Sequence, residues 1–473
     1  MNFNEQKTKI VATIGPASEN YEVMKRIIEA GVSTIRVNFS HGNPETHKNK
    51  FETARAISKE LDIPISLMLD TKGPEIRIGK MKNDLCYIAP KSTLSIKTDE
   101  ESYKNLIGDE KTISISYRMD KDVKAGNQVL LDDGKLVTIV KEVKQMEVIV
   151  ETVNGHNLKT NKRVNIPGVD FSIPFLSDKD KEDIKWGAGY KVDYIAASFV
   201  NSAKNVLEIR KILDENNGKH IQIISKIESQ TAINNIDEII QASDGIMIAR
   251  GDLGLEIPYY DVPYYEKRII RKCRLAGKEV IVATQMLDSM ENVPLPTRAE
   301  VTDVYFAVEI GADATMLSGE TASGKYPYEA VSTMSKIAKR AEKEYYTDPF
   351  YAHQIEKVAN NPSSRMLIAY EVAKILEKGE YKFAVVLSHS GKLLKEISKY
   401  RPNSYIIGVV SDEKLVWSFG VTSSVFCERH SEAVRALIKY NHEAANTILE
   451  KYGAKKGDKF IVVDSLNITM HEY

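Results

Sequence analysis

The run Gln222-Ile-Ile-Ser-Lys-Ile-Glu228 carries a lysine and a carboxylate at the end of one short apolar segment. Because side chains alternate along a β-strand, Lys226 and Glu228 point to one face while Ile227 points to the other. A second apolar run, Gly245-Ile-Met-Ile-Ala-Arg-Gly-Asp252, also ends in a carboxylate. A lysine and two acids at strand ends indicate a site that holds a divalent cation against an anionic substrate.

The same pattern recurs along much of the chain. Short β-rich runs separated by helix-like segments occur at 9–15, 34–40, 65–70, 194–200, 221–228, 245–252, 279–286 and 314–320. Nearly all of these runs end in polar residues, which include Arg36, Asn38, Ser40, Asp70, Thr71, Thr284, Gln285, Ser318 and Glu320. In a barrel of parallel strands, functional groups collect at the carboxyl ends of the strands. We therefore predict an α/β protein built on a (β/α)8 TIM barrel.

Two of the segments between these runs begin with helix-capping signals. In Ser177-Asp-Lys-Asp180 and Thr297-Arg-Ala-Glu300, a hydroxyl residue lies three positions before an acid, so side chains can satisfy the free amides of the first turn. We expect helices of the outer ring that reach Ala188 and Ile310. A single apolar run fits a buried strand of any α/β protein, but eight in order favour the barrel.

Composition sets limits on the class of protein. A chain of 473 residues with 42% hydrophobic and 28% charged residues is typical of a globular protein with two to four domains. Its 65 basic and 66 acidic residues form no long basic run, so we expect no nucleic-acid partner. The isolated Cys86, Cys273 and Cys427 indicate a reducing compartment. Without a secretory leader or membrane-spanning run, we expect a cytoplasmic protein with no membrane contact.

Residues 73–168 do not follow the barrel pattern. The helix period is lost, and short alternating segments occur at 95–97, 112–117, 128–132, 135–140 and 147–153. Asp133-Gly134 is typical of a hairpin turn, because glycine tolerates positive φ. We predict an all-β domain inserted between barrel segments 1–72 and 169–345. It leaves and rejoins the barrel on the face with the polar strand ends, so we expect a lid that excludes water. The alternative is a rigid inserted domain that does not act as a lid.

Residues 346–473 are expected to form a separate α/β domain of a regulatory type. The segments 383–387, 405–410, 421–427 and 459–463 indicate parallel strands with helices between them. The first of them leads into Ser388-His-Ser-Gly-Lys392 at the start of a helix, where backbone amides and the helix dipole favour a phosphate. An ordinary turn with a helix cap is an equally good interpretation of this segment.

The chain resembles the pyruvate kinase family over almost its whole length, most strongly in the barrel. Besides Ile221-Gln-Ile-Ile-Ser-Lys-Ile-Glu-Ser229, the resemblance is carried by Lys9-Ile-Val-Ala-Thr-Ile-Gly-Pro-Ala-Ser18, Arg36-Val-Asn-Phe-Ser-His-Gly42, Leu69-Asp-Thr-Lys-Gly-Pro-Glu-Ile-Arg77, Ala249-Arg-Gly-Asp-Leu-Gly254, Ala283-Thr-Gln-Met-Leu287, Pro296-Thr-Arg-Ala-Glu-Val301 and Met316-Leu-Ser-Gly-Glu-Thr-Ala322. It implies transfer of the phosphoryl group of phosphoenolpyruvate to ADP, giving pyruvate and ATP in the last step of glycolysis. It also implies a homotetramer.

The resemblance implies two kinds of metal ion. Glu228 and Asp252 match ligands of Mg²⁺ (or Mn²⁺), which prefers few carboxylates and completes its octahedron with water and substrate oxygens. A second Mg²⁺ would arrive with ADP. The matches to the K⁺ ligands are Asn38, Ser40, Asp70 and Thr71. In this family a glutamate at the position of Glu75 accompanies dependence on K⁺, so we expect K⁺ activation.

The resemblance also implies roles around the substrate. Lys226 would neutralise charge on the transferring phosphoryl group and the enolate oxygen; a structural salt bridge with Glu228 is the alternative. Thr284 matches the threonine near the protonated face of the enolate, with Ser318 and Glu320 in a nearby polar network and water as mediator. The other matches are the phosphate-binding Arg36 and Arg77, the substrate-carboxylate loop Gly251-Asp252, and the nucleotide-site residues Pro16, Asn38, His41, Arg77 and Lys162.

Two departures from the family pattern stand out. The motif Lys-Gly-Val-Asn-Leu-Pro-Gly reads Lys162-Arg-Val-Asn-Ile-Pro-Gly168, so Arg163 replaces a glycine at the lid hinge. The effector-phosphate loop of family members controlled by sugar phosphates matches Ser388, Ser390, Gly391 and Lys392, but Lys392 stands where a hydroxyl is common. The terminal segment 463–473 is short and poor in glycine. Binding of a sugar-phosphate or nucleotide effector therefore stays an open expectation.

Two other functions compete with the kinase. A metal-dependent carbon–carbon lyase acting on pyruvate-like enolates would use a barrel with Glu and Asp ligands, but it needs neither the insert nor the K⁺-type ligands. A noncatalytic descendant kept as an effector-binding or scaffold protein would be expected to have lost Lys226, Asp252 or Thr284. All three residues are present.

Overall fold

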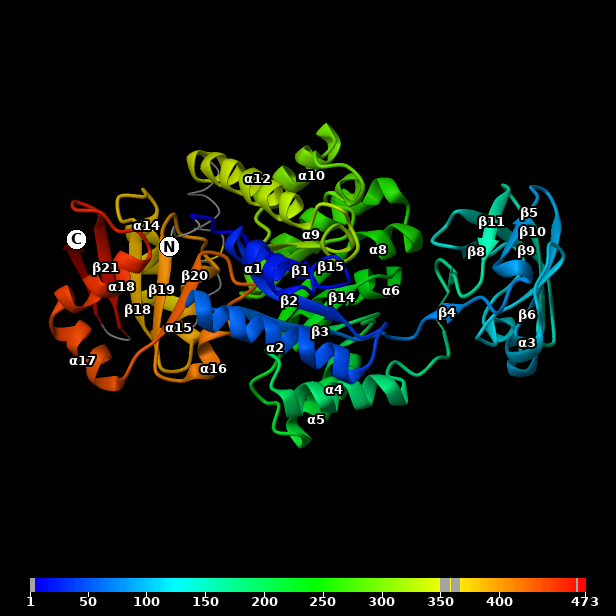
Figure 1. Cartoon of the computed structure of the whole chain (residues 1–473), viewed down its shortest axis with the longest axis horizontal. Coiled ribbons are helices and arrows are strands. Elements are labelled where there is room, and N and C mark those ends of the chain that lie inside the picture. Colours follow the sequence, from blue (N-terminus) through cyan, green and yellow to red (C-terminus); the bar gives the residue numbers. More distant parts are fainter. Residues whose placement is uncertain (1–4, 170, 349–357, 359–365, 465–466) are drawn as a thin grey trace.

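A central barrel carries an all-β insert on one side and an α/β domain on the other (Figure 1). The computed structural model describes residues 5–169, 171–348, 358, 366–464 and 467–473. This arrangement confirms the predicted fold class. The domain boundaries at 72/73, 168/169 and 345/346 stay predictions, and residues 1–4 and the stretch that follows the last boundary lie largely outside the described part of the chain.

Parallel strands close the barrel in the order β1-β17-β16-β15-β14-β13-β3-β2. Their bounds are β1 (Lys9–Thr13), β2 (Val32–Asn38), β3 (Ser66–Asp70), β13 (Tyr194–Ala197), β14 (Gln222–Ile227), β15 (Gly245–Ala249), β16 (Glu279–Ala283) and β17 (Ala314–Leu317). Each predicted run overlaps one of these strands, and seven contain their strand completely, whereas β2 begins two residues before the run 34–40. Because helices cover their outer faces, the strands are apolar along most of their length rather than alternating.

Several predicted runs extend past the ends of their strands, and for two of them the last residues belong to a helix: Glu320 of the run 314–320 lies in α11 (Gly319–Ala322), and Asp252 of the run 245–252 lies in α8 (Arg250–Glu256). The predicted run 245–252 ends as a strand at Ala249, and the chain turns directly into α8. Asp252 therefore lies in the first turn of a short helix and not at the end of a strand. The side chain still lies at the carboxyl end of β15, because the helix starts there.

Helices surround the barrel as an outer ring (Figure 1). The two predicted caps are confirmed: Ser177 and Asp180 form a capping box at α4 (Asp178–Tyr190), and Thr297 and Glu300 form one at α10 (Arg298–Glu309). The other principal helices are α1 (Tyr21–Glu29), α2 (Pro44–Leu61), α5 (Ala203–Glu215), α6 (Gln230–Asn234), α7 (Ile236–Ala242), α9 (Val262–Ala276), α11 (Gly319–Ala322) and α12 (Pro327–Thr347). Their apolar stripes and the outward-facing side chains of the strands form one buried core, and the inward-facing side chains of the strands form a second core inside the barrel.

The insert contains a seven-stranded sheet of order β4-β12-β8-β9-β10-β6-β7 and a two-stranded sheet β11-β5. The strands are β4 (Ile76–Arg77), β5 (Leu85–Ile88), β6 (Thr93–Lys97), β7 (Thr112–Ser114), β8 (Gln128–Leu131), β9 (Leu136–Lys144), β10 (Glu147–Thr152), β11 (His156–Lys159) and β12 (Arg163–Asn165). The predicted turn is confirmed, since Asp133 and Gly134 have φ of 55° and 79°. The strands β4, β5, β11 and β12 were not predicted, because two to four residues show little alternation.

The carboxyl-terminal domain is a five-stranded sheet of order β20-β19-β18-β21-β22. Its strands are β18 (Phe383–Leu387), β19 (Tyr405–Val410), β20 (Val425–Arg429), β21 (Lys459–Val463) and β22 (Ile468–Glu472), with helices α14 (Met366–Leu376), α15 (Lys392–Ser398), α16 (Glu413–Val416), α17 (Glu432–Tyr440) and α18 (Asn446–Lys451). The four predicted strands are parallel. Within the terminal segment 463–473, Ile468–Glu472 forms the antiparallel β22, whereas residues 465–466 lie outside the described residues.

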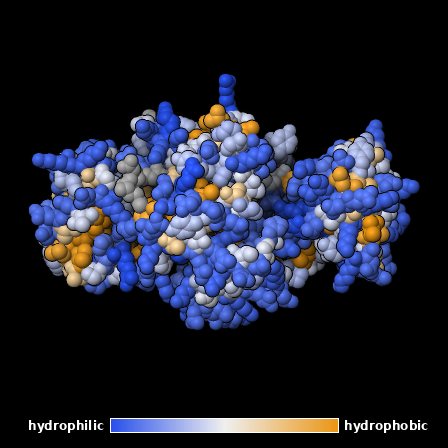
Figure 2. Space-filling model, in the orientation of Figure 1, coloured by the Kyte–Doolittle hydropathy of each residue, from blue (hydrophilic) through white to orange (hydrophobic). Residues whose placement is uncertain are grey.

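Hydrophilic side chains cover most of the face shown in Figure 2, including the hollow between the barrel and the insert. Among the described residues, no helix combines the length and apolarity needed to cross a membrane. Cys86, Cys273 and Cys427 are free thiols.

Candidate active site

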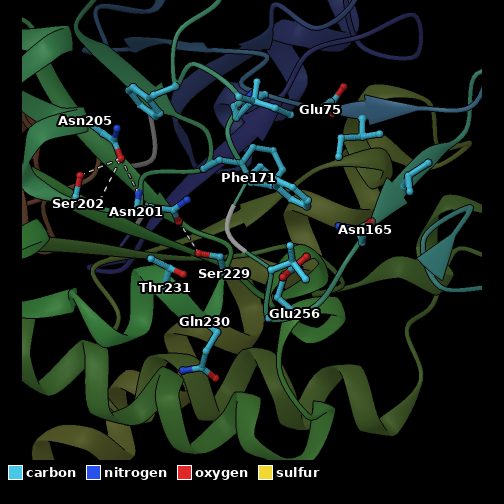
Figure 3. Close-up of a pocket in the computed structure, with 18 of the residues that line it drawn as sticks. Glu75, Asn165, Phe171, Asn201, Ser202, Asn205, Ser229, Gln230, Thr231 and Glu256 are labelled. Atoms are coloured by element: carbon cyan, nitrogen blue, oxygen red, sulfur yellow. Dashed lines mark hydrogen bonds between the residues drawn. The ribbon is translucent and has the colours of Figure 1, made fainter. Parts of the chain in front are cut away.

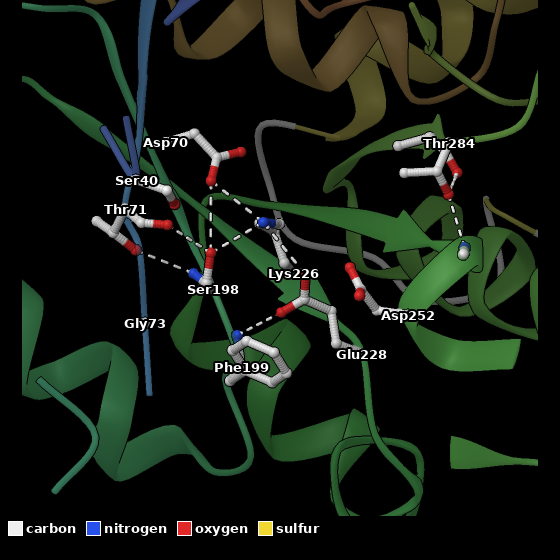
Figure 4. A network of polar contacts seen from close by, with 12 residues as sticks. Ser40, Asp70, Thr71, Gly73, Ser198, Phe199, Lys226, Glu228, Asp252 and Thr284 are labelled. Carbon is white, nitrogen blue, oxygen red and sulfur yellow. Dashed lines mark hydrogen bonds and ion pairs between the residues drawn. The ribbon is translucent and has the colours of Figure 1, made fainter. Parts of the chain in front are cut away.

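Lys226 is at the centre of a polar cluster at the carboxyl ends of the barrel strands (Figure 4). Its Nζ atom lies 3.1 Å from Asp70 Oδ1 and 3.2 Å from Glu228 Oε1, and it donates a hydrogen bond of 2.9 Å to Ser198 Oγ. Only 11% of the side chain is exposed, because β14 directs it into the barrel. The ammonium group is thus held between two carboxylates.

Asp70 also binds the guanidinium of Arg36. Arg36 Nε lies 2.7 Å from Asp70 Oδ2, and Arg36 Nη1 donates to Thr13 Oγ1 at 2.7 Å. Burial would raise the pKa of Asp70, but the cations of Arg36 and Lys226 lower it overall. Burial would lower the pKa of Lys226, but Asp70 and Glu228 raise it. Lys226 and Asp70 therefore keep their charges at neutral pH.

Glu228 and Asp252 lie beside each other at the edge of this cluster (Figure 4). Glu228 is 1% exposed and accepts a hydrogen bond of 2.6 Å from the backbone N–H of Phe199. Burial raises the pKa of Glu228, Lys226 opposes the shift, and the nearby charge of Asp252 adds to it. Two adjacent carboxylates whose ionised forms repel each other would be stabilised by a shared cation.

The donor set of these carboxylates fits Mg²⁺. Both side chains offer hard oxygen atoms, and Mg²⁺ takes few protein ligands while it keeps waters and substrate oxygens. Within the described part of the chain, no group of three or more His, Cys, Asp or Glu residues is arranged to hold a metal ion. A site with only two carboxylates is consistent with an ion that takes its other ligands from solvent and substrate.

The four residues matched to K⁺ ligands lie at the ends of β2 and β3. Asn38 Oδ1 accepts from the Ser40 backbone N–H at 2.9 Å. Thr71 accepts two hydrogen bonds from Ser198. The Ser198 backbone N–H donates to Thr71 Oγ1 at 3.1 Å, and the Ser198 hydroxyl donates to the Thr71 carbonyl at 2.6 Å. Figure 4 shows Ser40, Asp70 and Thr71 close together. This set of oxygen atoms with one formal charge fits a large monovalent cation.

Thr284 is held by the backbone. Its Oγ1 accepts from the Gly251 N–H at 2.7 Å and donates to the Ala283 carbonyl at 2.6 Å. Its φ of 70° is unusual for a β-branched residue, and such backbone strain is common at functional sites. In the described residues, no direct hydrogen bond joins Thr284 to Ser318 or Glu320, so the water-mediated network stays a prediction.

Glu320 binds backbone groups instead. It accepts from the Leu287 N–H at 3.1 Å and from the Ser318 N–H at 2.7 Å, and burial raises its pKa. Its carboxyl group therefore fixes the loops that follow β16 and β17. Any link from this carboxyl to Thr284 requires a bridging water or substrate atom.

The remaining predicted residues are spread around the mouth of the site. Arg77 pairs with Glu75, with Nη2 2.7 Å from Oε2. Lys162 Nζ lies 3.0 Å from Asp132 Oδ1, within the insert. His41 and Pro16 are exposed in the loops after β2 and β1.

Between the hinge of the insert and the barrel there is a cavity of about 360 Å³ (Figure 3). Its lining includes Glu75, Arg163, Asn165, Phe199 and Glu256. Burial raises the pKa of Glu256 to about 7, although hydrogen bonds from the Asn165 side chain and the Gly168 backbone oppose the shift. Because both donors belong to the returning hinge, Glu256 ties α8 to this hinge.

We expect the Glu256→Gln variant to remove a pH-dependent contribution to stability. The folded chain holds the Glu256 proton up to about pH 7, whereas the unfolded chain releases it near 4.5. This contribution is therefore complete below 4.5 and is lost as pH rises through about 7. Thermal midpoints measured from pH 4.5 to 8 should fall by a few degrees more in the wild type than in the variant. Parallel curves for the two proteins would contradict the shift.

Three site residues were missed by the sequence analysis. Ser198 and Phe199 directly follow β13. The rule that functional groups collect at the carboxyl ends of barrel strands could therefore have identified them. Arg163 was noted as a departure at the hinge, but its contacts with the barrel were not foreseen. Nothing in the local sequence pairs an insert residue with a barrel residue.

The segment matched to an effector loop forms a turn before α15. Ser388 is buried, and its Oγ accepts from the Gly391 N–H at 3.1 Å. Ser390 and Lys392 are exposed. The bond within this turn is consistent with a cap and with a phosphate loop alike, so the effector assignment stays a prediction.

Several known proteins similar to this chain are pyruvate kinases. A family profile described as "Pyruvate kinase, barrel domain" matches residues 5–331. A pyruvate kinase of Clostridium perfringens is 42% identical with 88% of each chain covered, and one of Mycoplasma pneumoniae is 40% identical with 96% of each covered. The crystal structure of a pyruvate kinase from Cryptosporidium parvum matches with a TM-score of 0.90 at 34% identity, covering 99% of this chain and 96% of that one. The similarity thus includes the insert and the carboxyl-terminal domain.

Proposed function

Because this chain belongs to the pyruvate kinase family and is a phosphotransferase that moves the phosphoryl group of phosphoenolpyruvate to ADP, we propose that Lys226, Glu228 and Asp252 form its reaction centre. The observation that carries this assignment is the buried Lys226 ammonium between two carboxylates. A charge cluster of this kind, buried at the functional face of a barrel, is typical of a catalytic site.

Lys226 is the residue that stabilises charge during the transfer. As the phosphoryl group leaves the enolate oxygen, negative charge grows on both, and a fixed ammonium in a buried site stabilises it strongly. Asp70, with Arg36 as its second partner, holds the ammonium in place. Arg36 and Arg77 offer planar forks of donors to phosphate oxygens.

Glu228 and Asp252 are the residues that would hold Mg²⁺, or Mn²⁺ in its place. A bound divalent ion supplies neutralisation of the phosphate and enolate oxygens. Asn38, Ser40, Asp70 and Thr71 would hold K⁺. Thr284 and Ser318 would deliver the proton to the enolate through water. The backbone around Gly251 and Asp252 would bind the substrate carboxylate, and the Gly251 N–H, which donates to Thr284 Oγ1 in this structure, would have to change partner to do so.

A coupled assay tests the reaction. Pyruvate formation should require phosphoenolpyruvate, ADP, a divalent cation and K⁺ together. Pyruvate formation that ignores ADP would favour the lyase, and no turnover with any combination would favour the noncatalytic protein. The homotetramer, the cytoplasmic location, the nucleotide residues His41, Pro16 and Lys162, and an effector at Ser388–Lys392 stay predictions.

We expect the Glu75→Lys variant to depend less on K⁺. An ammonium at this position supplies part of the positive charge that K⁺ provides, so the ratio of turnover with and without K⁺ should fall several-fold. Glu75 pairs with Arg77 and lies 3.5 Å from Arg163 Nε, so the substitution also removes two ion pairs. Glu75→Gln, which removes the pairs without adding a cation, is the control. An unchanged potassium titration would count against the assignment.

A further inference from the structure

Arg163 reaches from the insert into the metal-binding edge of the barrel. It lies in β12, on the strand by which the insert returns to the barrel, and its Nη1 is 2.5 Å from Asp252 Oδ1. Its Nε lies 3.5 Å from Glu75 Oε1, and its guanidinium is 5.6 Å from the ring centre of Phe199. The side chain is 22% exposed.

The electrostatic surroundings of Arg163 are those of a cation site. Burial would lower the pKa of Arg163, but the carboxylates of Asp252, Glu75 and Glu228 raise it well above its usual range. Two of these three carboxylates are the residues assigned above to Mg²⁺. The guanidinium therefore lies where the field favours a positive charge, on the same carboxylate that a divalent ion would use.

We propose that Arg163 binds the Asp252 carboxylate in the absence of divalent metal and competes with the metal for it. Arg163 thereby acts as a latch, a contact whose release couples metal binding to the position of the insert. The proposal rests on the proposed metal site. An arginine and a divalent cation on the same carboxylate repel each other, so the two are expected to exclude one another. Glu75 provides a partner for the guanidinium after it leaves Asp252.

The position of Arg163 links this competition to the insert. Arg163 pairs with Arg77 of β4 in the register of the two hinge strands, and β4 and β12 are the segments by which the insert joins the barrel. The hairpin turn at Asp133-Gly134 is a second place where the insert contacts the barrel domain, since Gly134 lies against Leu255 of α8. Release of Asp252 therefore removes one of the contacts that tie the insert to α8.

The test measures binding of Mn²⁺ alone, without substrates, to the full chain. The Arg163→Gln variant is expected to bind Mn²⁺ about tenfold more tightly than the wild type, which corresponds to about 1.4 kcal/mol. Arg118→Gln is the matched control: Arg118 also lies in the insert and pairs with Asp120, so the net charge changes equally but no site carboxylate is freed. Free Mn²⁺ can be followed by electron paramagnetic resonance.

A second readout follows the hinge. Amide hydrogen exchange at 73–77 and 162–168 should be slower in the metal-free wild type than in Arg163→Gln, and Mn²⁺ should accelerate it only in the wild type. Arg163→Lys, which keeps the charge but not the fork of donors, should give an intermediate Mn²⁺ affinity and serves if the glutamine variant fails to fold.

The Mn²⁺ affinities of two variants show whether the latch alone is wrong or the metal assignment is wrong as well. Equal or weaker Mn²⁺ binding by Arg163→Gln would overturn the latch. Asp252→Asn should bind Mn²⁺ much more weakly than the wild type. If it does and Arg163→Gln matches the wild type, only the latch is wrong; if Asp252→Asn binds normally, the metal assignment and the latch both fail.

Discussion

The Lys226→Met variant is expected to lower turnover by about 10²–10³-fold, the usual cost of removing one group that stabilises charge in a transition state. Methionine fills the space of the lysine stem but carries no charge, so the developing negative charge loses its fixed partner. Asp70 keeps Arg36, and Glu228 keeps the Phe199 N–H, so both carboxylates retain one donor. The fold should persist, although breaking buried ion pairs costs about 3–5 kcal/mol of stability.

The coupled assay and thermal unfolding together check this expectation. Lys278→Met is the matched control, because Lys278 is also partly buried and its Nζ donates to the Ser243 carbonyl, away from the site. This variant should keep near-normal turnover. A Lys226→Met protein that turns over at nearly the wild-type rate would show that the lysine is only a structural partner of Glu228, the alternative left open by the sequence.

The barrel and most of its site could be predicted because both follow from short-range patterns. Strands buried on both faces need continuous apolar runs, and side-chain alternation places Lys226 and Glu228 on one face. The observed ion pair between them follows directly from this spacing. Asp252 was assigned to a strand because Arg250 and Gly251 do not reveal where the strand ends and a helix begins.

Other parts of the site depend on contacts that no local pattern encodes. Phe199 and Thr284 have φ of 54° and 70°, conformations that bulky and β-branched residues avoid in isolation. Phe199 donates its N–H to Glu228 and Thr284 accepts from Gly251, so tertiary contacts accompany these conformations. The contact of Arg163 with Asp252 joins residues 89 positions apart and depends on how the insert is oriented.

The Glu228→Gln variant is expected to bind Mn²⁺ at least about 10²-fold more weakly, because loss of a charged ligand costs several kcal/mol and each 1.4 kcal/mol is tenfold. Glutamine has the same shape and can still accept from the Phe199 N–H, so the backbone after β13 should not move. Turnover should fall with metal affinity and should recover in part at high Mg²⁺. Glu279→Gln is the matched control, since Glu279 is equally buried and pairs with Lys395 at the opposite end of the barrel.

The pH dependence of metal binding separates a ligand from a bystander at this position. Burial raises the pKa of Glu228, and only its ionised form can hold a divalent cation. In the wild type, Mn²⁺ affinity should therefore weaken as pH falls through that raised pKa, at a higher pH than an exposed glutamate would require. Glu228→Gln cannot titrate, so its residual affinity should lack this step. A variant that keeps both the wild-type affinity and its pH dependence would exclude Glu228 as a ligand, and the metal would then have to bind elsewhere in the cleft.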